Sequence, residues 1–92
     1  MDLEELRNEI DAIDRELVCL FCKRMETAAK IADYKKEHNQ PISHPGREQE
    51  VLEKVSALAG TELGEYVQSL YAELFNLSKR FHSPVYFNCH IL

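Results

Sequence analysis

Apolar residues recur in steps of three and four through the first third of this 92-residue chain. The positions are Leu3, Leu6, Ile10, Ile13, Leu17 and Leu20, followed by Ala28 and Ile31. Such spacing is typical of one face of an α-helix. Asp2 and Glu5 have the spacing of a capping box, and neither Gly nor Pro occurs before Pro41. The sequence therefore predicts one helix of about 35 residues, roughly 53 Å long.

The length of this helix is incompatible with a compact single chain. A globule of this size has a radius of gyration near 12 Å and a diameter of only about 32 Å. The helix exceeds that diameter by roughly 20 Å, about four turns. Because the apolar face extends along the helix, a second chain has to cover the excess. We therefore expect an intertwined helical homodimer.

Two shorter helices are expected after a loop at residues 39–46, which holds two prolines and a glycine. The first helix runs from Arg47 to about Ala59, and Gly60 suits the position just after a helix end. The second runs from about Glu62 to Phe81 with apolar residues again in steps of three and four. The predicted fold is thus all-α, with three helices per subunit.

The C-terminal end of the chain has a different character. Pro84 should end the last helix, because the residue before a proline is driven out of α geometry. The following residues show no usable periodicity. We expect a helical domain at residues 1–82 and an irregular C-terminal tail at residues 83–92.

The charge balance excludes several classes of function. Eleven Lys and Arg against sixteen Asp and Glu give a net charge of −5, which argues against a general binder of nucleic acid or anionic membranes. No apolar run reaches the roughly 18–20 residues that a membrane span needs. The acidic start, MDLEE, lacks the basic region of a signal peptide, so a cytoplasmic location is expected.

The three cysteines are too few for a disulfide framework. Cys19 and Cys22 form a C-x-x-C pair, but they lie within the long helical pattern and no second pair follows. We interpret them as small apolar residues of the helix. The histidines show no ligand spacing either, so neither a metal nor another cofactor is expected.

Two cations interrupt the apolar face of the long helix. Arg24 and Lys35 are eleven residues apart, which places them within about 20° of each other around the helix, with the small Ala28 between them. A buried cation needs an anionic partner. Two interpretations stay open: both side chains reach solvent or pair with Glu26 or Asp33, or both belong to an anion-binding pocket.

Other polar residues are weaker candidates from the pattern alone. Arg7 lies seventeen residues before Arg24, roughly 25 Å along the helix, so the two can meet one small ligand only if Arg7 comes from a partner subunit. Glu48 suits the first turn of a helix on electrostatic grounds, with or without a functional role. Ser78 and His82 share a helix face at four-residue spacing.

Taken together, these residues resemble the all-α (type II) chorismate mutases. The resemblance rests on an ordered set of positions that covers about residues 3–82: Leu6-Arg7-x-x-Ile10-Asp11-x-Ile13-Asp14-x-x-Leu17, Arg24, Lys35, Pro41-Ile42-Ser43-His44-Pro45-Gly46-Arg47-Glu48-x-x-Val51-Leu52, and Ser78. It implies an intertwined dimer with two equivalent sites. It also implies the rearrangement of chorismate to prephenate, the branch of the shikimate pathway that leads to aromatic amino acid biosynthesis.

The resemblance also implies roles for the cationic residues. Arg24 and the partner subunit's Arg7 would hold the two carboxylates of chorismate, for which a guanidinium fork is well suited. Lys35 would donate to a carboxylate and to the ether oxygen, and Ser78 would assist one carboxylate. The dianionic substrate would then supply the anionic charge that the two cations of the long helix require.

The resemblance implies further roles for residues of the last two predicted helices. Glu48 would accept from the ring hydroxyl, and Arg47 would support the same wall. Two positions depart from the family pattern: His44 stands where Asp is usual before the second helix, and His82 where Gln or Glu is usual. We expect His82 to act with Lys35 as a catalytic residue, donating to the ether oxygen less effectively than Gln.

Two alternative functions remain on the sequence alone. Isochorismate pyruvate lyase shares the fold, the cationic pocket and a pericyclic reaction, and its products are salicylate and pyruvate. The second alternative is a catalytically weak dimerisation or regulatory module of the same fold, and the departures from the family pattern at His44 and His82 are an argument for it.

Overall fold

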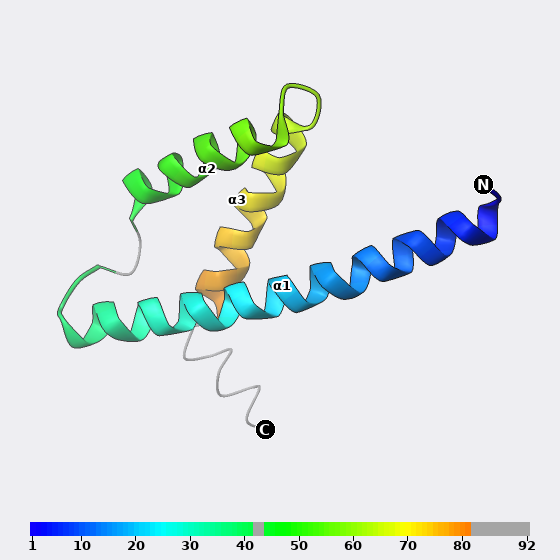
Figure 1. The fold of residues 1–92 in the computed structure, drawn as a ribbon. Helices are drawn as coiled ribbons and strands as arrows, with labels where there is room; N and C mark the ends of the chain where they lie inside the picture. The colour runs from blue at the N-terminus through cyan, green and yellow to red at the C-terminus, as the bar shows by residue number, and fades with distance from the viewer. Residues whose placement is uncertain (42–43, 82–92) are drawn as a thin grey trace.

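The computed structural model describes residues 1–41 and 44–81, which fold into three α-helices (Figure 1). The first helix, α1, spans Leu3–Glu37 and is 35 residues long, as the apolar spacing predicts. Asp2 is its N-cap, and the Asp2 carboxylate accepts a hydrogen bond from the Glu5 backbone N–H at 2.8 Å. The predicted C-terminal tail and His82 lie outside the described residues.

The second helix, α2, spans Pro45–Ala59 and begins two residues earlier than predicted. Pro45 fits the first turn because its fixed φ is helical and its missing N–H has no intrahelical role there. His44 is the N-cap, and its Nδ1 accepts a hydrogen bond from the Arg47 backbone N–H at 2.9 Å. The helix ends at Gly60, whose φ of 88° lies in the left-handed region that favours glycine.

The third helix, α3, spans Gly64–Phe81 and begins two residues later than predicted, because residues 61–63 form a turn. Gly64 is the one residue classed as buried in the part of the chain that the structure describes. A Cβ atom at Gly64 would lie 2.8 Å from Ser56 Oγ and 3.2 Å from the Ser56 carbonyl oxygen. The absence of a side chain therefore lets α2 and α3 approach closely where they are joined.

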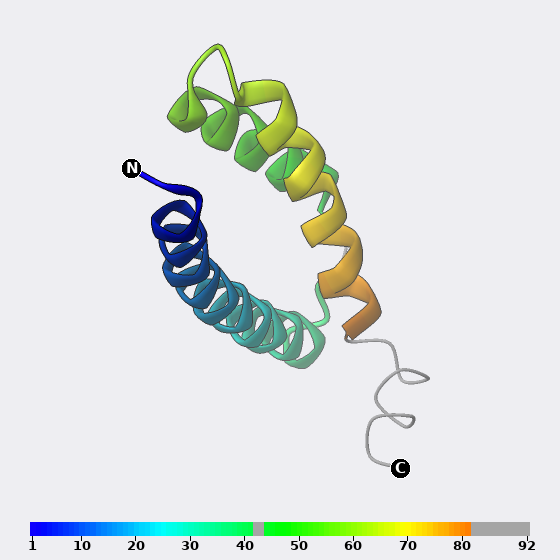
Figure 2. The same ribbon diagram turned by 90° about the vertical axis from the view of Figure 1, so that its right-hand side faces the viewer.

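In the part of the chain that the structure describes, the three helices do not enclose a buried core. Helices α2 and α3 form a pair joined by a tight turn, and α3 packs across the second half of α1 (Figures 1 and 2). The first half of α1 extends well past that pair (Figure 1). The Cα radius of gyration is 16.4 Å, against about 12 Å for a compact chain of this length.

The apolar face of α1 is open to solvent in the single chain. Leu6, Ile10, Ile13 and Leu17 are 45%, 55%, 53% and 56% exposed, and among the described residues no apolar side chain is fully buried. The mismatch between helix length and chain size is therefore present as predicted, whereas the homodimer that would cover this face stays a prediction. In the described part of the chain, no helix has the length and apolarity to cross a membrane.

Candidate active site

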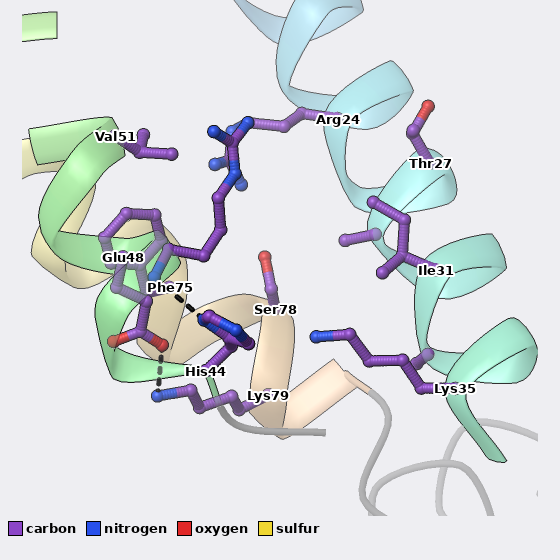
Figure 3. A pocket seen from close by; sticks show the side chains of 13 residues that line it. Arg24, Thr27, Ile31, Lys35, His44, Glu48, Val51, Phe75, Ser78 and Lys79 are labelled. Atoms are coloured by element: carbon purple, nitrogen blue, oxygen red, sulfur yellow. Dashed lines mark hydrogen bonds and ion pairs between the residues drawn. The ribbon is translucent and has the colours of Figure 1, made fainter. Parts of the chain in front are cut away.

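A pocket of about 310 Å³ lies between the second half of α1 and the α2–α3 pair (Figure 3). Its size is at the low end of the range for small-molecule sites. All three helices contribute to its wall, which is formed by Arg24, Thr27, Ala28, Ile31, Ala32, Lys35, His44, Arg47, Glu48, Val51, Phe75, Ser78 and Lys79.

Arg24 extends from α1 toward the other two helices and is half-buried (Figure 3). Its guanidinium carbon lies 5.3 Å from the centre of the Tyr71 ring and 5.6 Å from that of Phe75. Cations are attracted to the faces of aromatic rings at such distances. The two rings lie four residues apart on α3 and meet edge to face, with centroids separated by 6.3 Å. They hold the guanidinium without neutralising its charge.

Lys35 lies on the same face of α1, eleven residues after Arg24, and is also half-buried. Its ammonium group extends from α1 toward α3 and Ser78 (Figure 3). Ala28 and Ile31 line the wall between the two cations. The small Ala28 side chain leaves room for a ligand there. The two cations that interrupt the apolar face thus line one pocket.

Glu48 lies on the opposite wall, near the start of α2. Its Oε1 is 2.7 Å from the Nζ atom of Lys79 on α3, and its side chain is 30% exposed. Within the described residues it is the one carboxylate that lines the pocket. Lys79 was not predicted from the sequence, because nothing in the periodicity of α3 brings this residue next to Glu48.

His44 and Arg47 form the edge of the pocket at the start of α2. The hydrogen bond from the Arg47 backbone N–H to His44 Nδ1 corresponds to the imidazole tautomer with its hydrogen on Nε2. The Arg47 guanidinium lies 3.3 Å from Glu50 Oε2, and both side chains are largely exposed. Surface pairs of this kind hold little energy, so Arg47 can leave Glu50 for a more strongly charged ligand.

Ser78 faces the pocket from α3 (Figure 3). Its hydroxyl donates to the Leu74 carbonyl oxygen at 2.8 Å and lies 3.5 Å from the Met25 sulfur. The oxygen of this hydroxyl can still accept a hydrogen bond, and rotation about its Cα–Cβ bond would let it donate to a ligand instead.

The structure brings together Arg24, Lys35, Arg47, Glu48 and Ser78 but not Arg7. Arg7 lies on the exposed first half of α1, seventeen residues before Arg24, and does not line the pocket of its own chain. Among the described residues, no group of three His, Cys, Asp or Glu side chains is placed to hold a metal ion. Cys19 and Cys22 are exposed free thiols on α1.

The pocket is electropositive. Its wall holds four Lys and Arg side chains and one carboxylate, a formal charge of +3 for the described residues. The apolar lining from Ala28, Ile31 and Val51 lowers the local dielectric constant and so strengthens the attraction between these cations and an anionic ligand. The arrangement suits a small organic anion with more than one negative group and an apolar body.

Comparison with known proteins identifies the family of this pocket. The sequence model described as chorismate mutase type II matches residues 6–83. The chain belongs to the type II chorismate mutase family. A solved structure titled as a chorismate mutase from Thermus thermophilus superposes with a TM-score of 0.78 and 28% identity. That match covers 83% of this chain and 96% of the Thermus chain.

Two relatives each match more than half of this chain. A bifunctional chorismate mutase/prephenate dehydratase from Aquifex aeolicus is 44% identical over 57 residues, 62% of this chain. A 4-amino-4-deoxychorismate mutase from Streptomyces venezuelae is 34% identical over 58 residues, 63% of this chain. This chain spans 16% of the length of the Aquifex protein and 56% of the Streptomyces protein.

Proposed function

We propose that this chain is a chorismate mutase that converts chorismate to prephenate. The observation that supports it most strongly is the juxtaposition of Arg24 and Lys35 on one face of α1 inside a small electropositive pocket. Chorismate carries two carboxylates on a compact carbon skeleton, and this matches both the excess of positive charge and the apolar lining. Membership of the type II family supports the same substrate.

The reaction is an intramolecular Claisen rearrangement. The ether C–O bond breaks while a new C–C bond forms, in one chair-like transition state and without transfer of a group to the protein. The enzyme therefore contributes by holding the substrate in the reactive conformer and by stabilising the charge that builds up on the ether oxygen. Fixed cations in a partly desolvated pocket do both.

The residues of α1 take the anionic side of the substrate in this proposal. Arg24 binds a carboxylate as a bidentate fork, and its position over Tyr71 and Phe75 keeps that fork in place. Lys35 donates to the second carboxylate and to the ether oxygen. Ser78 adds a hydrogen bond to a carboxylate from α3.

Helix α2 binds the ring hydroxyl of the substrate in this proposal. Glu48 accepts a hydrogen bond from it with the carboxylate oxygen that is not bound to Lys79. Arg47 strengthens the electropositive edge above it. His82 is proposed to donate to the ether oxygen. A cytoplasmic location stays a prediction.

The proposal includes a homodimer in which each pocket is completed by Arg7 of the partner subunit. The exposed apolar face on the first half of α1 supports this arrangement, because a second copy of that face would cover it. The distance of roughly 25 Å between Arg7 and Arg24 along α1 excludes their meeting within one chain. An antiparallel partner helix would bring its own Arg7 to the Arg24 end.

The activity is tested by following chorismate consumption by absorbance and identifying the product. We expect prephenate, and at least a hundredfold fall in kcat/KM for Arg24→Ala, as removal of one partner of a buried charge pair costs about 3 kcal/mol or more. Salicylate as the product would instead support the lyase. Absence of turnover together with failure to bind a chorismate transition-state analogue would support a regulatory module, because binding of the analogue indicates a pocket complementary to the transition state.

The shared pocket is tested by mixing two variants. Homodimers of Arg7→Ala and of Arg24→Ala each lack one cation in both pockets. A mixed dimer has one intact pocket and one that lacks both cations. Random reassortment makes half of the dimers mixed, so about a quarter of the unaltered activity should return. If no activity returned after subunit exchange, the shared pocket would be contradicted.

A further inference from the structure

We propose that Lys79 sets the substrate specificity of this pocket: through its ion pair with Glu48, it favours an uncharged hydroxyl over an ammonium group on the substrate ring. The inference rests on the proposed function, in which Glu48 accepts from that hydroxyl. It concerns a residue that the mechanism above does not use.

The ion pair joins two helices at the pocket wall. Lys79 Nζ on α3 lies 2.7 Å from Glu48 Oε1 on α2, and both residues line the cavity (Figure 3). The Glu48 side chain is 30% exposed and that of Lys79 is 44% exposed, so the carboxylate is the more shielded of the two. One carboxylate oxygen is bound to the lysine, which leaves the other to accept from a ligand.

The charge of Lys79 decides which donors Glu48 can accept. A lone carboxylate at this position would attract an ammonium group more strongly than a neutral hydroxyl. With Lys79 bound, the pair is neutral overall. A ligand ammonium that approached the second oxygen would come within about 5 Å of the lysine ammonium, where like charges repel appreciably. A hydroxyl makes the same hydrogen bond without that repulsion.

The neutral pair also suits the rest of the ligand. Glu48 is the one carboxylate among the described residues of the wall, so it would repel a dianion that the other side chains attract. Lys79 offsets this repulsion. Its removal should therefore weaken turnover of chorismate and at the same time improve acceptance of an amino-substituted ring.

A purely structural role for the ion pair makes a different prediction. Exposed ion pairs typically add little to stability, and loss of a brace between α2 and α3 would lower the activity toward every substrate alike. The ratio of kcat/KM for two substrates that differ only at the ring substituent cancels such a general loss. That ratio is thus the informative measurement.

The experiment compares chorismate with the analogue in which an amino group replaces the ring hydroxyl, using the full chain. For Lys79→Met we expect the ratio of kcat/KM, hydroxyl over amino, to fall about tenfold, which corresponds to about 1.4 kcal/mol. Lys79→Arg keeps the charge and should retain the original ratio. Lys54→Met, at an exposed position of α2 outside the pocket, is the matched control and should also retain it.

Two outcomes would overturn the inference. An unchanged ratio in both Lys79→Met and Lys79→Gln, with helical circular dichroism intact, would show that Lys79 does not select the substituent, while the proposed function would stand. Failure of the unaltered chain to turn over chorismate would remove the proposed function itself, and the specificity argument with it. Using two neutral replacements guards against one that fails to fold.

Discussion

Ile13→Glu should separate the two subunits. Ile13 lies at the middle of the apolar face of the first half of α1 and keeps 53% of its surface exposed in the single chain. Covering that surface in a dimer is worth about 1 kcal/mol, half or less of the value for a whole apolar side chain. A glutamate there loses this gain and adds at least about 2 kcal/mol for an unpaired polar group in the interface.

The substitution occurs once in each subunit, so the dimer loses about 6 kcal/mol in total, which raises the dissociation constant roughly 10⁴-fold. Sedimentation velocity over a range of protein concentrations measures this change directly. Asn8→Glu places the same charge on the opposite side of α1 and should leave the dissociation constant nearly unchanged. The reasoning would be refuted if the unaltered chain sedimented as a folded 10.7 kDa species, or if Ile13→Glu dimerised as tightly as Asn8→Glu.

Three further substitutions test individual contacts. His44→Ala removes the N-cap of α2 and should cost about 1 kcal/mol in the free energy of unfolding by urea, whereas His44→Asp should restore it. Gly64→Ala puts a Cβ against Ser56 and should destabilise the fold by about 1–3 kcal/mol in the same assay, with partial recovery when Ser56→Ala removes the nearest oxygen. Arg24→Lys keeps the charge but loses the bidentate fork, and kcat/KM for chorismate should fall about tenfold to a hundredfold; an unchanged value would contradict carboxylate binding by Arg24.

Much of the fold follows from the sequence because the signals are local. The cap at Asp2 and the three-four spacing of apolar residues fix the start and the extent of α1. The two boundary errors have local causes as well. Pro45 is a favourable first-turn residue that starts α2 early. Residues 61–63 form a turn, after which α3 starts at Gly64, close to Ser56 of α2.

The site is only partly predictable for a related reason. Arg24 and Lys35 stand out because cations break an apolar pattern on one helix, and that pattern can be read along the chain. The pairing of Lys79 with Glu48 depends on how α3 lies against α2. The rings of Tyr71 and Phe75 under Arg24 depend on the packing of α3 against α1. The periodicity of a helix indicates which of its faces packs, but not which residues of another helix meet that face.

Because α1 is one continuous helix, the number of residues between Arg7 and Arg24 matters for function. Under the proposed arrangement, one rigid rod delivers Arg24 to its own pocket and Arg7 to the neighbouring one. Inserting a single residue between them would turn Arg7 by about 100° and shift it by about 1.5 Å. Seven inserted residues would nearly restore its direction but displace it by about 10.5 Å. Both active sites would lose the arginine that the partner subunit supplies, although every original amino acid remained. The spacing of seventeen residues between Arg7 and Arg24 is therefore a constraint that substitutions cannot test.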